Sequence, residues 1–241
     1  NYVANKDVTA EPTTSLYCLE NTFNLANMMQ GQTTRVVFKA TYKPASLPEG
    51  ETTFYKIGKN IAIWSKDNLV KEIKAAVASV VTGATTDKIE VKLDAEGNNI
   101  TAAGTHYIKA DNISVTGVEA ETIEKAITAI NTQLGLKESD KVGISTYADG
   151  DSYYIARIKH FGDDLTEWKS GLYDEKNLEY LGRYGVLRNN WYELTVQSVS
   201  GPGYPSVPDV KPNTPDDEDD KYINVSVKIL DWAKRSQKVD L

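Results

Sequence analysis

Alternation of apolar and polar positions is clearest near the end of the chain. Residues 222–232 carry apolar side chains at every second position, namely Ile223, Val225, Val227 and Ile229. A period of two is typical of a β-strand with one buried face. Residues 33–42 alternate in the same way, and residues 152–161 and 190–200 are rich in the β-branched and aromatic side chains that strands favour. We therefore expect a mainly β chain.

Two segments show instead the three-to-four-residue spacing of an amphipathic helix. The first spans about residues 67–81, with Asp67 as a candidate N-cap and Gly83 after its end; its apolar stripe is Leu69, Ile73, Val77 and Val80. The second spans about residues 119–134 and is followed by Gly135; its stripe is Ile123, Ile127, Ile130 and Leu134. Each helix has one apolar face, so we expect both to be inserted between strands and to lie over a sheet or over each other.

The composition changes sharply after residue 200. Residues 201–221 hold five of the eight prolines and the acidic run 216–220. Proline stiffness and repulsion between like charges predict an extended, solvated linker here. The expected organisation is an N-terminal arm over residues 1–17, a β-rich domain over residues 18–200, this linker, and a terminal strand with its tail over residues 222–241.

Charge and cysteine content narrow the classes of protein. With 27 Lys and Arg against 34 Asp and Glu, the net charge is −7, which argues against a nucleic-acid binder that needs a basic face. No apolar run approaches the roughly 18 residues that cross a bilayer, so we expect no membrane-spanning segment. The single cysteine, Cys18, excludes an internal disulfide and an all-cysteine zinc site. The 14 tyrosines suit the half-buried sheet faces of a β-rich exported protein.

Candidate catalytic residues are few. The sequence contains no GxSxG, P-loop, GxGxxG or HExxH motif. His160 ends a predicted strand, and Asp163 and Asp164 are loosely suggestive partners, so a hydrolase built on His160 is a distant alternative. His106 lies in a polar strand, and residues 149–151 resemble a calcium loop without its remaining ligands. We expect no catalysis, no cofactor and no metal site.

Five segments together resemble a known family. They are CLENTF (18–23), TTRVVFKATY (33–42), YYIARIKHF (153–161), YGVLRNNWYELTV (184–196) and INVSVKILDW (223–232). In this order they are similar to the C-terminal domain of the Bacteroidales fimbrillins, the subunits of type V fimbriae, and among these to shaft subunits of the short (minor) fimbria. Each motif alone is weak, but their order over much of the chain is fairly specific.

The resemblance implies a structural role and a transthyretin-like β-sandwich with the two helices inserted. Fimbrillins are exported lipoproteins, and an arginine-specific protease removes their first strand. The groove that this leaves accepts a strand from the C-terminal end of the next subunit. The implied partners are other copies of the subunit, anchor and tip fimbrial proteins, and host or bacterial surface receptors. The implied place is outside the cell, in a fimbrium on the outer membrane that supports adhesion and virulence. The implied donor positions are Ile223, Val225, Val227 and Ile229, with Trp232 as a terminal anchor.

Three features depart from the family's processing pattern. The N-terminal domain that provides the acceptor groove has no counterpart in this sequence, so we expect the groove to lie outside this chain. Cys18 belongs to CLENTF rather than to a lipobox, and we assign it no lipid. Arg35 lies inside a predicted strand, which makes it a poor processing site.

The energetics of strand addition agree with the donor role that the resemblance implies for residues 222–232. Main-chain hydrogen bonds supply affinity, and alternate side chains fill pockets. Burying four apolar side chains gives about 6–12 kcal/mol, and ordering about nine residues costs a comparable amount. A stable polymer therefore also needs ladder hydrogen bonds and a preformed groove. The alternative is that residues 222–232 are simply the last strand of their own domain, and both can hold at different stages of assembly.

A second hypothesis comes from another class of protein. The chain would be a glycan-binding β-sandwich module of a surface or secreted protein, with sugars stacked on exposed aromatic rings such as Trp168, Tyr173 and Tyr204. Polymer ladders that resist boiling would favour the fimbrial subunit, whereas stabilisation by sugars would favour the glycan-binding module.

Overall fold

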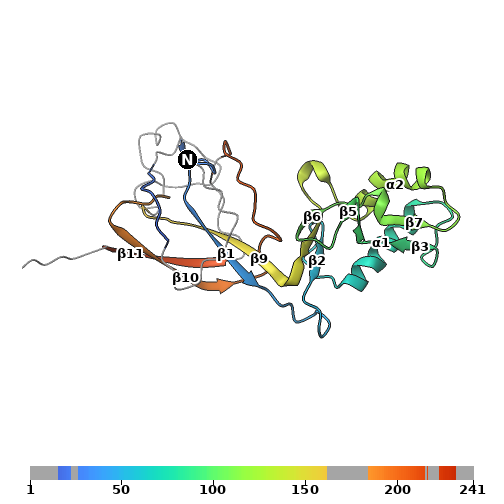
Figure 1. Ribbon diagram of the computed structural model, residues 1–241, viewed down its shortest axis with the longest axis horizontal. Coiled ribbons are helices and arrows are strands. Elements are labelled where there is room, and N and C mark those ends of the chain that lie inside the picture. Colours follow the sequence, from blue (N-terminus) through green and yellow to red (C-terminus); the bar gives the residue numbers. More distant parts are fainter. Residues whose placement is uncertain (1–15, 23–26, 162–183, 215, 217–222, 232–241) are drawn as a thin grey trace, which may run out of the picture. The chain divides into compact units, whose positions relative to one another are not determined.

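The computed structural model describes residues 16–22, 27–161, 184–214, 216 and 223–231 (Figure 1). The chain divides into two compact units. Unit 1 comprises residues 1–39, 153–203 and 207–241, and unit 2 comprises residues 40–152 and 204–206. Unit 2 is therefore almost entirely an insertion into the sequence of unit 1.

The described strands of unit 2 form three small antiparallel sheets. The largest has the order β2-β8-β6 and consists of β2 (Phe54–Ile57), β8 (Ile144–Tyr147) and β6 (Gly104–His106). The others pair β3 (Ile89–Val91) with β7 (Ile113–Val115), and β4 (Asp94–Ala95) with β5 (Asn98–Asn99). Three short 3-10 helices belong to the same unit: η2 (Ala110–Asn112) precedes β7, η3 (Glu138–Asp140) precedes β8, and η4 (Ala148–Gly150) follows β8.

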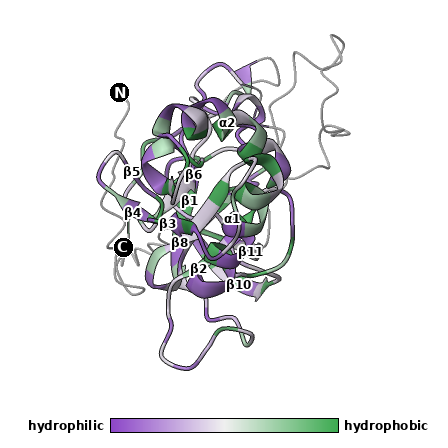
Figure 2. Cartoon of the chain, turned by 90° about the vertical axis from the view of Figure 1, so that its right-hand side faces the viewer, coloured by the Kyte–Doolittle hydropathy of each residue, from purple (hydrophilic) through white to green (hydrophobic). Residues whose placement is uncertain are grey.

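The two predicted helices are confirmed as α1 (Lys66–Val80) and α2 (Ala120–Gln133). They contact each other, and each carries both hydrophobic and hydrophilic residues (Figure 2). Their apolar positions enter the core of unit 2, where the buried residues include Leu69, Ile73, Val77, Ile123 and Ile130. The predicted N-cap is wrong: Ser65 caps α1, because it directly precedes the first helical residue and its hydroxyl accepts a hydrogen bond from the Asn68 N–H at 3.4 Å. Asp67 lies in the first turn, where its charge interacts favourably with the helix dipole.

Unit 1 holds the strands that the alternating patterns predict. Strand β1 (Arg35–Thr41), which begins in unit 1, pairs with β9 (Asp151–Arg157), and β10 (Asn190–Val199) pairs antiparallel with β11 (Ile223–Asp231). Asn21 also forms an antiparallel bridge with Val186. The described core of unit 1 includes Met28, Tyr154, Ala156, Ile158, Tyr184 and Val186.

The prediction of a mainly β chain with two helices is confirmed. Among the described residues the strands form five small sheets of two or three strands each, and the transthyretin-like sandwich stays a prediction. In that same part of the chain, no helix combines the length and the apolar character that crossing a bilayer requires.

Candidate functional site

The predicted donor strand is β11, and the structure pairs it with β10 of its own chain. The register places Ile229 opposite Tyr192, and the further apolar pairs are Val227 with Leu194, Val225 with Val196 and Ile223 with Val199. The four predicted donor positions therefore alternate along β11, and their register partners on β10 are Tyr192, Leu194, Val196 and Val199. The fifth predicted position, Trp232, lies outside the described residues.

A β-bulge in β10 keeps this apolar face in register. Val196 pairs with Val225, but the next pair is Ser198 with Asn224, so Gln197 is an extra residue on β10. Without the extra residue Ser198 would stand opposite Ile223. With it, Val199 takes that position, and the apolar pairing continues to the end of β11.

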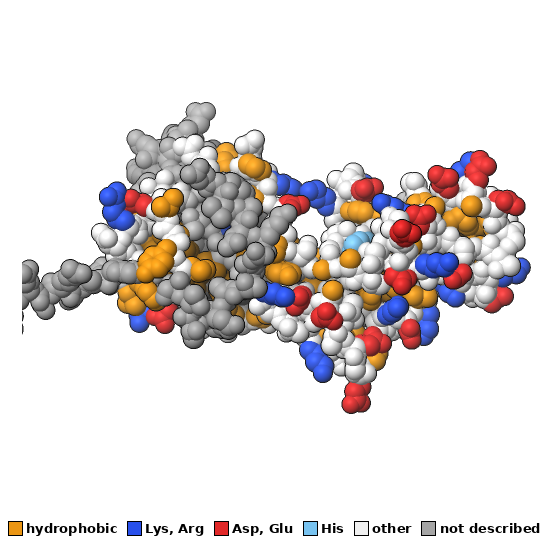
Figure 3. Space-filling view, viewed as in Figure 1, with side chains coloured by type: hydrophobic (Ala, Val, Ile, Leu, Met, Phe, Trp, Pro, Cys, Tyr) orange, Lys and Arg blue, Asp and Glu red, His pale blue; other side chains and the backbone are white. Residues whose placement is uncertain are grey.

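The two faces of the β10–β11 ribbon differ in chemistry. On the other face, Glu193 pairs with Lys228, whose ammonium lies 4.0 Å from the carboxylate, and Thr195 pairs with Ser226. The ribbon also exposes large apolar side chains, which are Trp191, Val196, Val199, Ile229 and Leu230 at 37–43%. Figure 3 shows hydrophobic side chains at the surface where β10 and β11 lie. The apolar face that includes Ile229 and Val196 is therefore incompletely covered.

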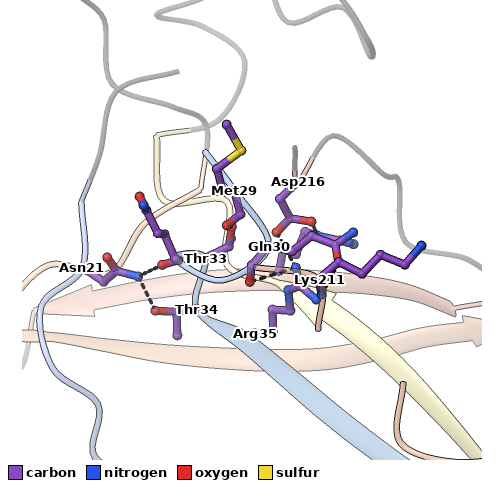
Figure 4. A network of polar contacts seen from close by, with 10 residues as sticks. Asn21, Met29, Gln30, Thr33, Thr34, Arg35, Lys211 and Asp216 are labelled. Carbon is purple, nitrogen blue, oxygen red and sulfur yellow. Dashed lines mark hydrogen bonds and ion pairs between the residues drawn. The ribbon is translucent and has the colours of Figure 1, made fainter. Parts of the chain in front are cut away.

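The buried carboxylate of Asp216 lies a few residues before β11. It is fully buried, its Oδ1 accepts a hydrogen bond from Arg157 Nε at 2.7 Å, and its Oδ2 lies 3.3 Å from Arg35 Nη2 without hydrogen-bond geometry. The Arg157 guanidinium also lies over the Tyr184 ring, 5.9 Å from its centroid. Two arginines, Arg35 on β1 and Arg157 on β9, thus share one carboxylate, and Figure 4 shows Arg35 beside Asp216.

This arrangement corrects the expectation of a fully solvated linker over residues 201–221. Asp216 is buried because the two nearly buried arginines need a carboxylate to balance their charge. At the other end of the segment, residues 201–203 are buried, and the Tyr154 hydroxyl donates to the Gly201 carbonyl at 3.0 Å. The division of the chain into arm, domain, linker and terminal strand stays a prediction.

Main-chain hydrogen bonds hold the residues next to Asp216 against the loop that precedes β1. The donors and acceptors are Gln30 N–H to Thr214 O at 2.8 Å, Gly31 N–H to Pro212 O at 3.2 Å, and Asp216 N–H to Met28 O at 2.8 Å. The Lys211 N–H donates in addition to the Gln30 side-chain oxygen at 3.2 Å (Figure 4). Residues 211–214 and Asp216 are called the strap below.

The other resemblance motifs have structural positions. Asn21 of CLENTF exchanges two main-chain hydrogen bonds with Val186, and its side chain donates to the Thr34 hydroxyl at 3.0 Å and to the Gln32 carbonyl. Cys18 is an exposed free thiol. Arg35 lies in a strand, as predicted, but it is the first residue of β1, and its side chain is nearly buried against Asp216.

The histidines and acidic turn have ordinary structural partners. His160 Nδ1 lies 2.8 Å from the Tyr192 hydroxyl, and burial lowers the pKa of His160. His106 Nε2 lies 2.8 Å from the Ala102 carbonyl. Asp149 accepts a hydrogen bond from the Thr52 hydroxyl at 3.2 Å, with a left-handed backbone (φ 53°). These contacts place His160, His106 and Asp149 in hydrogen bonds within the chain.

Several candidate residues cannot be compared with the structure. Asp163, Asp164, Trp168 and Tyr173 lie outside the described residues, whereas Tyr204 is described and half-buried. Over the part of the chain that is described, no group of three or more His, Cys, Asp or Glu side chains could hold a metal ion.

Sequence reasoning missed the strap and its two arginines. Arg35 and Arg157 lie in strands that contain other polar residues, such as Lys39 in β1 and Asp151 in β9, so the pattern does not mark either arginine as buried. The acidic run itself suggests solvent rather than a buried partner.

Comparison with known families agrees with the motif resemblance. The family model described as "Major fimbrial subunit protein type IV, Fimbrillin, C-terminal" matches residues 145–238. The matched span begins within β8 and includes β10, the strap and β11. No curated protein sequence matches the chain. The match supports the predicted fimbrillin C-terminal domain over residues 145–238, and the resemblance to shaft subunits of the short fimbria stays a prediction.

Proposed function

We propose that the chain is a structural subunit of a fimbria, which the match of residues 145–238 to the fimbrillin C-terminal family model supports, and that it polymerises by donating β11 to a groove on the neighbouring subunit. The donor positions are Ile223, Val225, Val227 and Ile229, with Trp232 as terminal anchor. The neighbour is another copy of the subunit, and anchor and tip fimbrial proteins join at the ends of the fibre.

The observation that carries this proposal is the state of β11 within its own chain. Among the described residues β11 has one strand partner, β10, and the two form a ribbon that is not hydrogen-bonded to a third strand. A two-stranded ribbon is marginally stable by itself in water. An unpaired strand edge, which β11 has among the described strands, is the feature that β-augmentation uses.

The donor face of β11 is incompletely buried in its pairing with β10, and this supplies a driving force for strand exchange. When β11 leaves, it gives up its hydrogen bonds and its apolar pairs with β10, so a groove that only replaces them gains nothing. Ile229 is still 37% exposed in the home ribbon. A groove that covers the apolar face on both sides buries this remaining area, at about 25 cal/mol per Å². The pairing of β11 with β10 in the same subunit is therefore suited to a state that precedes assembly.

The wider role follows from the family. We propose that the fibre stands on the outer-membrane surface of a bacterium, outside the cell, and supports adhesion to host or bacterial receptors and thereby virulence. We propose no catalytic role, and His160 contributes to the packing of β10 through its bond to Tyr192.

A reversible disulfide between β10 and β11 tests strand donation. Thr195 and Ser226 are register partners on the exposed polar face, and paired Cα atoms in antiparallel strands lie about 4.5–5.5 Å apart, as a disulfide requires. Thr195→Cys with Ser226→Cys is introduced into the subunit as its cells export it, in a Cys18→Ser background. The oxidised protein should give no ladder on an unboiled denaturing gel, and reduction should restore the ladder.

A matched control places the same disulfide in unit 2. Glu90 and Ser114 are exposed register partners on β3 and β7, so Glu90→Cys with Ser114→Cys leaves β11 free. This variant should form ladders when oxidised and when reduced. A ladder from the oxidised β10–β11 variant would remove β11 as the donor.

A further inference from the structure

The strap holds the chain shortly before β11 begins. Asp216 is the described residue closest to β11 on its N-terminal side, seven positions before Ile223. We infer that the strap stays on its own subunit when β11 is exchanged, and that Asp216 is the pivot from which the donor strand leaves. This boundary between the fixed and the exchanged part of the chain rests on the proposed function and deepens it.

The charges around Asp216 make release of the strap costly. Release would take the carboxylate away from Arg157, whose Nε bonds it at 2.7 Å, and from Arg35 at 3.3 Å. The side chains of both arginines are at most 10% exposed. Two nearly buried guanidinium groups would then have lost their carboxylate, which is strongly unfavourable.

Close packing of the backbone holds the strap as well. Three main-chain hydrogen bonds join it to residues 28–31, as described above. A Cβ atom added to Gly31 would lie 2.8 Å from Pro212 Cα, so only glycine allows this approach. The strap is therefore seated by backbone contact as well as by charge.

The contrast with β11 identifies the part of the chain that separates. Asp216 is fully buried, whereas Ser226, Lys228, Ile229 and Leu230 of β11 are all exposed. Opening free energies are lowest for elements with few buried contacts. β11 can therefore open while the strap remains closed.

A fixed pivot limits where the neighbouring subunit can be. Seven residue steps separate Asp216 from Ile223, and a fully extended chain spans at most about 25 Å over that length. The edge that accepts β11 must then approach to within this distance of Asp216. The exposed strap residues 211–213 lie next to that joint, so the second copy docks beside the strap.

Hydrogen exchange of the full subunit, as monomer and as polymer, tests the pivot. The amides of Gln30, Gly31 and Asp216 report the strap because their acceptors are Thr214, Pro212 and Met28. They should stay protected in both states, while β10 amides lose protection in the polymer as β11 leaves. Loss of protection at Gln30, Gly31 and Asp216 in the polymer would overturn the pivot but leave strand donation intact. Unchanged β10 protection in the polymer would instead contradict strand donation itself.

A pair of charge variants tests the same point in the monomer. Asp216→Asn releases the strap, so the tether of β11 then runs from Gly203, the nearest buried residue upstream, over 20 residue steps instead of seven. Effective concentration falls roughly as the −3/2 power of tether length, so β10–β11 amides should exchange about fivefold faster. Asp209→Asn removes one negative charge from an exposed position close to the strap, and it should leave the exchange rates of the β10–β11 amides unchanged.

A second variant covers the case in which Asp216→Asn does not fold. Gly31→Ala removes no charge, but it pushes on the Pro212 backbone and is expected to displace the strap together with Asp216. It should give the same faster exchange in β10–β11 while the amides of α1 and α2 remain as protected as before. The amide of residue 31 in this variant should exchange faster, which would show that the strap has moved. If β10–β11 amides then still exchange as slowly as in the unchanged protein, the strap does not control β11.

Discussion

The Tyr192 hydroxyl lies 2.8 Å from His160 Nδ1 and thereby fixes β10 to the segment that follows β9. The same oxygen accepts a hydrogen bond from the Leu187 N–H at 2.8 Å. The two rings also meet edge-on, with centroids 5.8 Å apart. Tyr192 is the β10 partner of Ile229, so its hydroxyl holds β10 in unit 1 at a position where β11 is proposed to leave.

We expect the stability of unit 1 to fall as the pH drops below about 6.5. Burial lowers the pKa of His160, so the folded state binds a proton less readily than the unfolded state. Between the ordinary histidine pKa of about 6.5 and the lower folded value, the unfolded state binds more protons, and the folded state loses stability as the pH falls. Urea midpoints between about pH 7.5 and about pH 5 measure this.

Substitution of each histidine separates this effect from other titrations. His160→Gln removes the titrating group and should flatten the fall in the urea midpoint. His106→Gln, in unit 2, serves as the matched control and should leave the fall unchanged. An undiminished pH dependence in His160→Gln would assign it to other groups.

The buried Asn112 side chain makes a second prediction, for unit 2. Its Oδ1 accepts from Asn98 Nδ2 at 2.7 Å and from the Lys109 N–H at 3.0 Å, and its Nδ2 donates to the Lys92 and Asn98 carbonyls at 2.8 Å each. Asn112→Ala leaves these groups without their partner, at about 1–3 kcal/mol each. We expect a loss of at least about 3 kcal/mol in the free energy of unfolding by urea.

Asn99→Ala is the matched control for Asn112→Ala. Asn99 is exposed, and its side chain accepts hydrogen bonds from Thr101 alone among the contacts described for it. Its loss should cost less than about 1 kcal/mol. Equal costs for the two variants would contradict the role given to burial of Asn112.

Periodicity predicted the elements of this chain but not their partners. The stripes of α1 and α2 and the alternation in β1, β9, β10 and β11 depend on neighbours in the sequence, which the pattern records directly. The pairing of β10 with β11 joins residues about 30 positions apart, and the break of alternation at Gln197 signals a bulge without saying which strand lies opposite.

Asp216 shows why the strap could not be predicted. It stands 59 positions from Arg157 and opens a run of five acidic residues, for which solvation is the ordinary expectation. A nearly buried arginine requires a carboxylate partner, but the sequence does not show which arginines are buried. With 34 acidic residues in the chain, only the folded arrangement selects one of them.

The two arginines around Asp216 should differ in their contributions to stability. Arg157 makes a hydrogen bond of 2.7 Å to Asp216, whereas Arg35 makes an ion pair of 3.3 Å without hydrogen-bond geometry. Removing either arginine leaves one guanidinium and one carboxylate, so the expected difference comes from the hydrogen bond that Arg157 makes to Asp216. We expect Arg157→Met to cost about 1.5–3 kcal/mol and Arg35→Met about 1 kcal/mol, measured by urea unfolding.

Comparison of the two variants is its own control, since both remove one guanidinium from the same cluster. Equal costs would show that Asp216 depends on both arginines alike. A larger cost for Arg35→Met would point instead to its hydrogen bond with the Gln30 carbonyl at 3.1 Å as the main contribution.

A single charge on the donor face should stop polymerisation. Val227 is the register partner of Leu194 and lies in the middle of the four donor positions. Val227→Asp brings a carboxylate into an apolar groove without a partner, which disfavours strand insertion by at least about a hundredfold. The variant should remain a folded monomer and give no ladder on an unboiled gel.

Ser226→Asp places the same charge one position away. Ser226 is exposed, and its hydroxyl accepts a hydrogen bond from Gln197 Nε2 at 2.9 Å on the polar face of the ribbon. A carboxylate there remains in solvent, so this variant should form ladders. Loss of the ladder in both variants would indicate a general effect of charge on assembly. An unfolded Val227→Asp monomer would mean that β11 serves mainly as the last strand of its own subunit, because strand donation predicts that the monomer survives the change.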